Sequence, residues 1–154
     1  IALGELILLP TYQIQRFLLP RLHKNNIEQF MYPLIISSMI IVIGFLFFLF
    51  FGKDIIYLVL KEKYNIALLF FISKFMFLYA FIKNINVQIN LILHNSNKDL
   101  FLKNITVLVG ILSIPFHLFF IINLNIIGLV ISIILLEILF LILGIFYHKK
   151  NLNI

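Results

Sequence analysis

Long runs of apolar residues, separated by short polar connections, make up almost the whole chain. Each run holds about 20 residues, the length that an α-helix needs to cross the hydrocarbon core of a bilayer. The runs show no alternation of apolar and polar positions, which a transmembrane β-strand would have. The pattern predicts an all-α, polytopic transmembrane helix bundle with five spans, at residues 2–22, 33–51, 65–90, 105–122 and 126–147.

The connections between the spans are short and carry most of the polar residues. Pro33 is expected in the first turn of the second span, where its missing N–H group does no harm. The segment 52–64 contains an apolar stretch that is too short to span, so it is expected at the membrane interface. Asn123–Asn125 is predicted to be a tight turn between the last two spans.

Composition identifies the class of protein. The chain is 63% hydrophobic and only 12% charged, whereas a soluble domain carries roughly 25% charged residues. It is therefore predicted to be an integral membrane protein. The absence of cysteine excludes disulfides and thiolate metal sites.

The sequence gives no sign of catalysis or of a bound cofactor. It has no paired His-Glu metal spacing, no Gly-rich phosphate loop and no extramembrane region large enough for a catalytic triad. We therefore expect no enzyme activity, no cofactor and no metal site. The basic residues are too few and too dispersed for a nucleic-acid interface, so no nucleic-acid partner is expected.

The distribution of Lys and Arg predicts the orientation. One side of the membrane would collect Arg16, Arg21, Lys24, Lys98, Lys103, Lys149 and Lys150. The other would collect Lys53, Lys61 and Lys63. The positive-inside rule places the larger set, and with it the C-terminus, in the cytoplasm. Five spans then put Ile1 outside, and since Ile1 is not a Met, we expect an upstream part of the protein to precede it.

The segment 65–93 combines an apolar first part with a polar second part, and Lys74 lies inside it. A charge at the bilayer centre costs roughly 2.5–3.5 kcal/mol on insertion scales, which favours a position facing the bundle interior. At about 100° per residue, Lys74, Asn84 and Gln88 share one side of the helix, and Asn86 lies on the opposite side. The first three are predicted to line a cavity. The alternative for Lys74 is an ammonium that extends to the membrane interface.

Glu137 lies near the middle of the fifth span. Because a low dielectric disfavours the charged carboxylate, a protonated Glu137 is compatible with this position. Glu137 is therefore a candidate for proton coupling. The alternative is a neutral carboxyl group that is hydrogen-bonded to a neighbouring helix. For His117, in the fourth span, we expect polar packing rather than ligand binding.

Four segments resemble a known family. They are FLLPRLHK at 17–24, DIIYLVLKEKYNIA at 54–67, NIIGLVISIILLE at 125–137, and the basic tail after Tyr147. In these segments and in the order of its spans, the chain resembles the C-terminal part of the Wzx-like O-antigen flippases of the MOP superfamily. The resemblance implies that the five spans are the last five of twelve, in one half of a two-bundle transporter whose N-terminal bundle is missing from this chain.

The resemblance also implies a function. Such a protein moves undecaprenyl-pyrophosphate-linked oligosaccharide repeat units across the bacterial cytoplasmic (inner) membrane by alternating access. Its partners would be the lipid-linked oligosaccharide, membrane lipid and the missing N-terminal half. Lys74 would then face the pyrophosphate, Asn84 and Gln88 would offer hydrogen bonds to sugar hydroxyls, and Glu137 would couple the cycle to protons.

Two other functions remain open at this point, and a third does not fit the predicted connections. A drug or cation efflux carrier of the same superfamily would share the architecture. A non-transporting membrane subunit of five helices fits if the chain begins close to Ile1. A membrane-embedded polysaccharide polymerase would need a large outer loop with catalytic side chains, and the predicted outer connections at 52–64 and 123–125 are too small for one.

Overall fold

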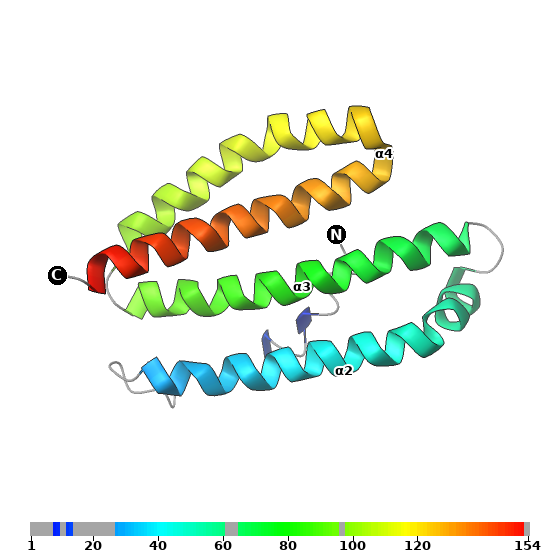
Figure 1. Ribbon diagram of the computed structural model, residues 1–154, viewed down its shortest axis with the longest axis horizontal. Helices are drawn as coiled ribbons and strands as arrows, with labels where there is room; N and C mark the ends of the chain where they lie inside the picture. Colours follow the sequence, from blue (N-terminus) through cyan, green and yellow to red (C-terminus); the bar gives the residue numbers. More distant parts are fainter. Residues whose placement is uncertain (1–7, 10–11, 14–26, 61–64, 96–97, 153–154) are drawn as a thin grey trace.

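The computed structural model describes residues 8–9, 12–13, 27–60, 65–95 and 98–152. Its main elements are three helices, α2 (Ile27–Leu60), α3 (Ile66–Asn95) and α4 (Asp99–Leu152) (Figure 1). Each is long and apolar enough to cross a membrane. The described residues therefore confirm an all-helical fold with membrane-spanning character, but they give three such helices rather than the predicted five. Most of the predicted first span, 2–22, lies outside these residues.

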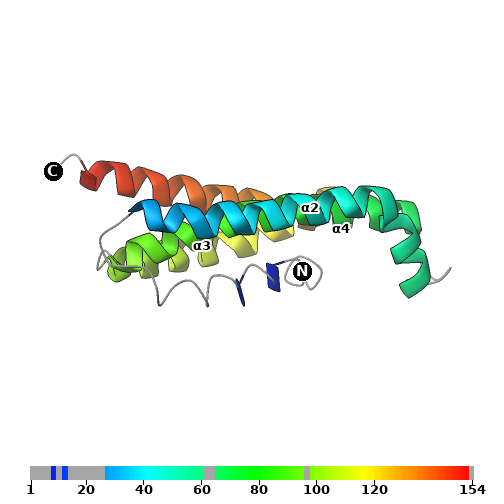
Figure 2. The same ribbon diagram turned by 90° about the horizontal axis from the view of Figure 1, so that it is seen from below.

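The second predicted span and the segment after it form one helix. α2 begins at Ile27, so Pro33 lies inside the helix and the prediction that it would occupy the first turn is wrong. Its missing N–H leaves one backbone acceptor of the preceding turn without a partner. Ser37 Oγ, one turn later, donates to the Pro33 carbonyl oxygen at 2.6 Å. The last turns of α2 bend away from the bundle (Figure 2).

α3 is the central helix and lies between α2 and α4 (Figure 1). Its start is capped by Asn65, whose Oδ1 accepts from the Leu68 N–H at 3.1 Å. Its apolar half supplies much of the core, in which side chains of α2, α3 and α4 pack together. The buried members of this core are Leu8, Ile41, Met76, Phe77, Tyr79, Ala80, Val130 and Ile134.

α4 is a helical hairpin rather than one straight helix. Its backbone leaves helical geometry at Asn125, where φ is 53° and ψ is −138°. The two arms on either side fold back against each other (Figure 1). His117 Nδ1 lies 2.6 Å from Ser132 Oγ across the hairpin, and the rings of Phe101 and Tyr147 stack at 3.3 Å between their open ends. The break coincides with the turn that the sequence predicts at Asn123–Asn125.

The backbone conformation at Asn125 leads to a testable prediction about the free energy of unfolding. A positive φ with this ψ is unfavourable for residues that carry a Cβ, and such conformations cost on the order of 1–3 kcal/mol. Glycine adopts positive φ without that cost. We expect Asn125→Gly to raise the free energy of unfolding by about 1 kcal/mol, measured by thermal unfolding in detergent micelles. Asn104→Gly, in the exposed helical part of α4, is the control and should lower stability; the same direction for both variants would contradict the prediction.

Candidate functional site

Amide side chains are buried in the second half of α3. Asn84, Asn86 and Gln88 are 1%, 3% and 3% exposed, and Asn90 is partly buried. We call these four residues the amide band. Burying an amide in apolar surroundings is unfavourable unless its polar atoms find hydrogen-bond partners. The partners of the band therefore decide whether it is a packing feature or a binding site.

The amide band contacts both neighbouring helices. Asn84 Nδ2 donates to Ser38 Oγ of α2 at 3.2 Å. Asn86 Nδ2 donates to α4, to the backbone oxygen of Glu137 at 2.9 Å and to its carboxylate Oε2 at 2.7 Å. Asn84 and Asn86 thus point to opposite sides of α3, as their spacing predicts. The band bridges α2 and α4 through polar contacts.

Glu137 is held by its contact with α3. The Asn86 side-chain amide donates two hydrogen bonds to this one residue, one to its backbone oxygen and one to its side-chain Oε2. This is the neighbouring-helix hydrogen bond that the sequence offers as an alternative to proton coupling. The sequence identified Glu137 as a candidate, but it did not identify Asn86 as the residue that contacts it. The only signal for the pair was that both are polar residues inside apolar helices.

Three polar atoms of the amide band are buried and have no hydrogen-bond partner among the described residues. They are Asn86 Oδ1, Gln88 Nε2 and Asn90 Oδ1. Leaving such a group unsatisfied costs roughly 1–3 kcal/mol. Two acceptors and one donor are thus unsatisfied within about one turn of α3, with Asn86 and Asn90 on one side of the helix and Gln88 on the opposite side.

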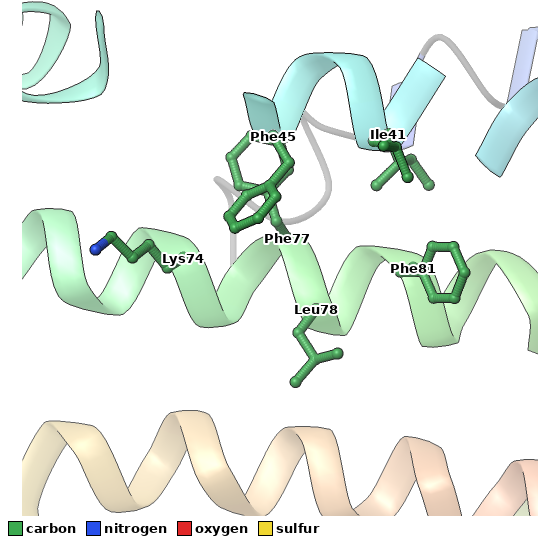
Figure 3. A pocket seen from close by; sticks show the side chains of 7 residues that line it. Ile41, Phe45, Lys74, Phe77, Leu78 and Phe81 are labelled. Carbon is green, nitrogen blue, oxygen red and sulfur yellow. The ribbon is translucent and has the colours of Figure 1, made fainter. Parts of the chain in front are cut away.

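Lys74 lies apart from the amide band. Ten residues separate it from Asn84, which is about 15 Å along a helix axis. The structure therefore does not bring it together with Asn84 and Gln88, and its predicted role in a shared cavity stays a prediction. Its ammonium lies 4.5 Å from the centroid of the Phe70 ring, toward the start of α3. Figure 3 shows the side chain extending along α3 away from Phe81.

A groove between α2 and α3 begins at Lys74. Its volume is about 270 Å³, and apart from Lys74 its walls are apolar. The other lining residues are Ile41, Val42, Phe45, Phe77, Leu78 and Phe81 (Figure 3). Lys74 is thus the one charged residue on an apolar surface.

The His117 side chain contacts another residue of α4, across the hairpin. Ser132 Oγ lies 2.8 Å from the Leu129 carbonyl oxygen as well as 2.6 Å from His117 Nδ1, so it links both arms of the hairpin. This geometry fits the polar packing role expected for His117. Within the described ranges, no group of three or more His, Asp or Glu side chains could hold a metal ion.

The two halves of α3 therefore differ in chemistry. The second half carries amides with unused hydrogen-bonding atoms, and the first half carries a lysine beside an apolar groove. The Glu137 carboxylate joins the amides from α4. No known family model, curated protein or solved structure matches this chain.

Proposed function

We propose that this chain is the C-terminal transmembrane bundle of a transporter that moves undecaprenyl-pyrophosphate-linked oligosaccharide units across the bacterial inner membrane. The observation that carries the proposal is the buried amide band with its three unused polar atoms. Sugar hydroxyls both donate and accept hydrogen bonds. Hydroxyls can therefore satisfy the acceptors Asn86 Oδ1 and Asn90 Oδ1 on one side of α3, and another hydroxyl can satisfy the donor Gln88 Nε2 on the opposite side.

A transport role explains the unused atoms better than a purely structural role does. A helix that only holds a bundle together loses stability when its buried amides lack partners. Polar side chains inside membrane spans generally mark the pathway of a substrate or ion. A hydrophilic cargo that is bound transiently needs such groups to replace its water.

The contacts of the amide band also suit alternating access. Asn84 is tied to α2 through Ser38, and Asn86 is tied to α4 through Glu137. Movement of either neighbouring helix would therefore change how the band is reached. In transporters of this kind, bundles rock around a binding site near the bilayer midplane.

We assign the oligosaccharide contacts to Asn84, Gln88 and their neighbours in the amide band, and ion coupling to Glu137. Lys74 receives no cargo contact in this proposal because it lies about 15 Å from Asn84 along α3. The proposal includes five spans, a further N-terminal bundle and a cytoplasmic C-terminus.

The proposal is tested by complementation in a bacterial strain that lacks its O-antigen flippase. The gene for this chain, expressed with all coding sequence in its frame, should restore surface polysaccharide. Gln88→Leu and Asn84→Leu should each reduce surface polysaccharide strongly, because leucine keeps the volume but removes the hydrogen-bonding atoms. The amount of polysaccharide per cell is measured against the amount of membrane-inserted protein.

Asn104→Leu is the matched control, since Asn104 is exposed on α4 and outside the amide band. It should restore polysaccharide to the level of the unchanged protein. Full restoration by both amide-band variants would overturn the assignment of cargo contacts. No restoration by the unchanged gene, despite normal insertion, would count against the flippase itself.

A further inference from the structure

Two lysines from different helices each lie within about 6 Å of the centroid of the same aromatic ring. Lys74 Nζ of α3 lies 4.5 Å from the centroid of the Phe70 ring, and Lys53 Nζ of α2 lies 5.6 Å from the same centroid. We call Lys53 and Lys74 the lysine pair. Within the described part of the chain, neither ammonium forms an ion pair with a carboxylate. The pair therefore brings two positive charges to one ring, and neither is held in a direct ion pair, although Asp54 follows Lys53 in the chain.

The lysine pair adjoins the apolar groove between α2 and α3. Lys74 belongs to both, and the Phe48 ring connects them, packing on Phe70 at 5.4 Å and on Phe77 at 5.3 Å. From Lys74 the groove follows α3 toward Phe81 (Figure 3). The groove holds about 270 Å³, well above the roughly 150 Å³ of an engineered apolar cavity that takes up benzene.

The groove opens at the surface of the described helices. Val42 of α2 and Leu78 of α3, which line it, are each 47% exposed. In a bilayer, a groove of this kind is accessible to the chains of neighbouring lipids. A ligand that uses the whole surface must combine a negative charge with a flexible apolar chain.

We propose that the lysine pair and the groove together bind an anionic membrane phospholipid. Its phosphate would lie between the ammonium groups of Lys53 and Lys74, in charge-assisted hydrogen bonds. One acyl chain would lie in the groove against Phe45, Phe77 and Phe81. Inorganic phosphate would use only the lysines, and a phospholipid without net charge would gain little from them, so an anionic phospholipid is the ligand that matches both parts.

The position of Lys74 along α3 fits this ligand. Lys74 lies eight residues after the start of α3 at Ile66, which is about 12 Å along the axis, and its side chain extends back toward that start. Lysines near helix ends commonly place the ammonium at headgroup level in this way. The groove then runs from the headgroup region toward the bilayer centre, as an acyl chain does. This inference does not depend on transport.

Native mass spectrometry of the full chain in detergent micelles tests the proposal. Phosphatidylglycerol and phosphatidylcholine with identical acyl chains are titrated separately, and the fraction of lipid-bound protein is measured. We expect tighter binding of phosphatidylglycerol. Combining Lys53→Gln with Lys74→Gln should weaken it by roughly 25-fold, because one basic residue near anionic lipid contributes about 1 kcal/mol, or about fivefold. Phosphatidylcholine binding should change little.

Two further variants separate the parts of the site. Lys98→Gln with Lys103→Gln removes two lysines at the start of α4 and should leave phosphatidylglycerol binding unchanged. Leu78→Trp should occupy the groove and weaken binding of both lipids. Circular dichroism checks that each variant keeps its helical content, and the lysine substitutions lie outside the core cluster, so they should fold normally.

Equal binding of the two lipids by the unchanged chain would overturn the proposal. So would an equal loss in the two double-lysine variants, since this would show that binding depends on overall charge only. Geranylgeranyl pyrophosphate serves as a competing probe. If it bound while phosphatidylglycerol did not, the surface would belong to an isoprenoid pyrophosphate, and the phospholipid assignment would be wrong.

Discussion

Gly128→Ala should destabilise the α4 hairpin more than an alanine at any other glycine in the described residues. A Cβ built on Gly128 would overlap the backbone carbonyl oxygen of Phe120 on the other arm and would lie 2.9 Å from the Cβ of Leu124. A backbone oxygen cannot rotate aside as the end of a side chain can. Overpacking costs typically 1–3 kcal/mol and more where the backbone must move, so we expect a loss of about 3 kcal/mol in unfolding free energy.

The control for Gly128 is Gly110, which lies in the first arm of the same hairpin. A Cβ there would meet nothing within 4 Å. Because glycine is roughly 0.8–1.0 kcal/mol less favourable than alanine inside a helix, Gly110→Ala should stabilise the chain. Unfolding of both variants in detergent micelles, followed by circular dichroism, should therefore move in opposite directions. Wild-type stability of Gly128→Ala would show that the arms are further apart than in the structure.

Glu137→Gln should keep the fold and abolish transport. The side-chain oxygen of glutamine can still accept the hydrogen bond from Asn86 Nδ2, so the free energy of unfolding should change by less than about 0.5 kcal/mol. Glutamine cannot release or take up a proton, and proton coupling is the role that we propose for Glu137. Transport is measured as restored surface polysaccharide per inserted protein, and stability as thermal unfolding of the purified chain.

The structural contribution of Glu137 is measured separately. Asn86→Leu removes both hydrogen bonds to Glu137, and hydrogen bonds between membrane helices contribute about 0.6 kcal/mol on average and up to about 1.7 kcal/mol. It should therefore destabilise the chain by about 1–2 kcal/mol, and Glu137→Leu by less, since the backbone acceptor remains. Full transport by Glu137→Gln would leave Glu137 with this packing role alone and would remove proton coupling from the proposal.

The sequence predicted what depends on local geometry. The angular spacing along a helix is fixed by the backbone, so the sequence alone predicts that Asn84 and Asn86 lie on opposite sides of α3, and their contacts with α2 and α4 confirm it. The turn at Asn123–Asn125 could be predicted because two asparagines separate two apolar runs, each about long enough to cross a membrane. Pro33 was misplaced because helix-forming residues precede it, so α2 begins earlier and Ser37 bonds back to the Pro33 carbonyl.

The contacts between helices could not be predicted from the sequence. Asn86 meets Glu137 only because α3 and α4 pack at one particular register, with Gly144 of α4 allowing close approach by Ile89 of α3. Lys53 and Lys74 lie near the same Phe70 ring for the same kind of reason, since their separation along the chain says nothing about how α2 and α3 pair. Long-range register is set by the packing of many side chains together.

The hairpin shape of α4 has a consequence for how the chain is inserted into the membrane. Its two arms run antiparallel, so Asp99 and Leu152 lie at the same end of the molecule (Figure 1). Within 104–147, Glu137 is the one acidic residue and there is no Lys or Arg, so the arms can leave the insertion machinery together as a paired unit. Whatever depth the arms reach, α4 returns the chain to the side on which it began. A reporter fused after α4 would therefore give the location of the connection between α3 and α4.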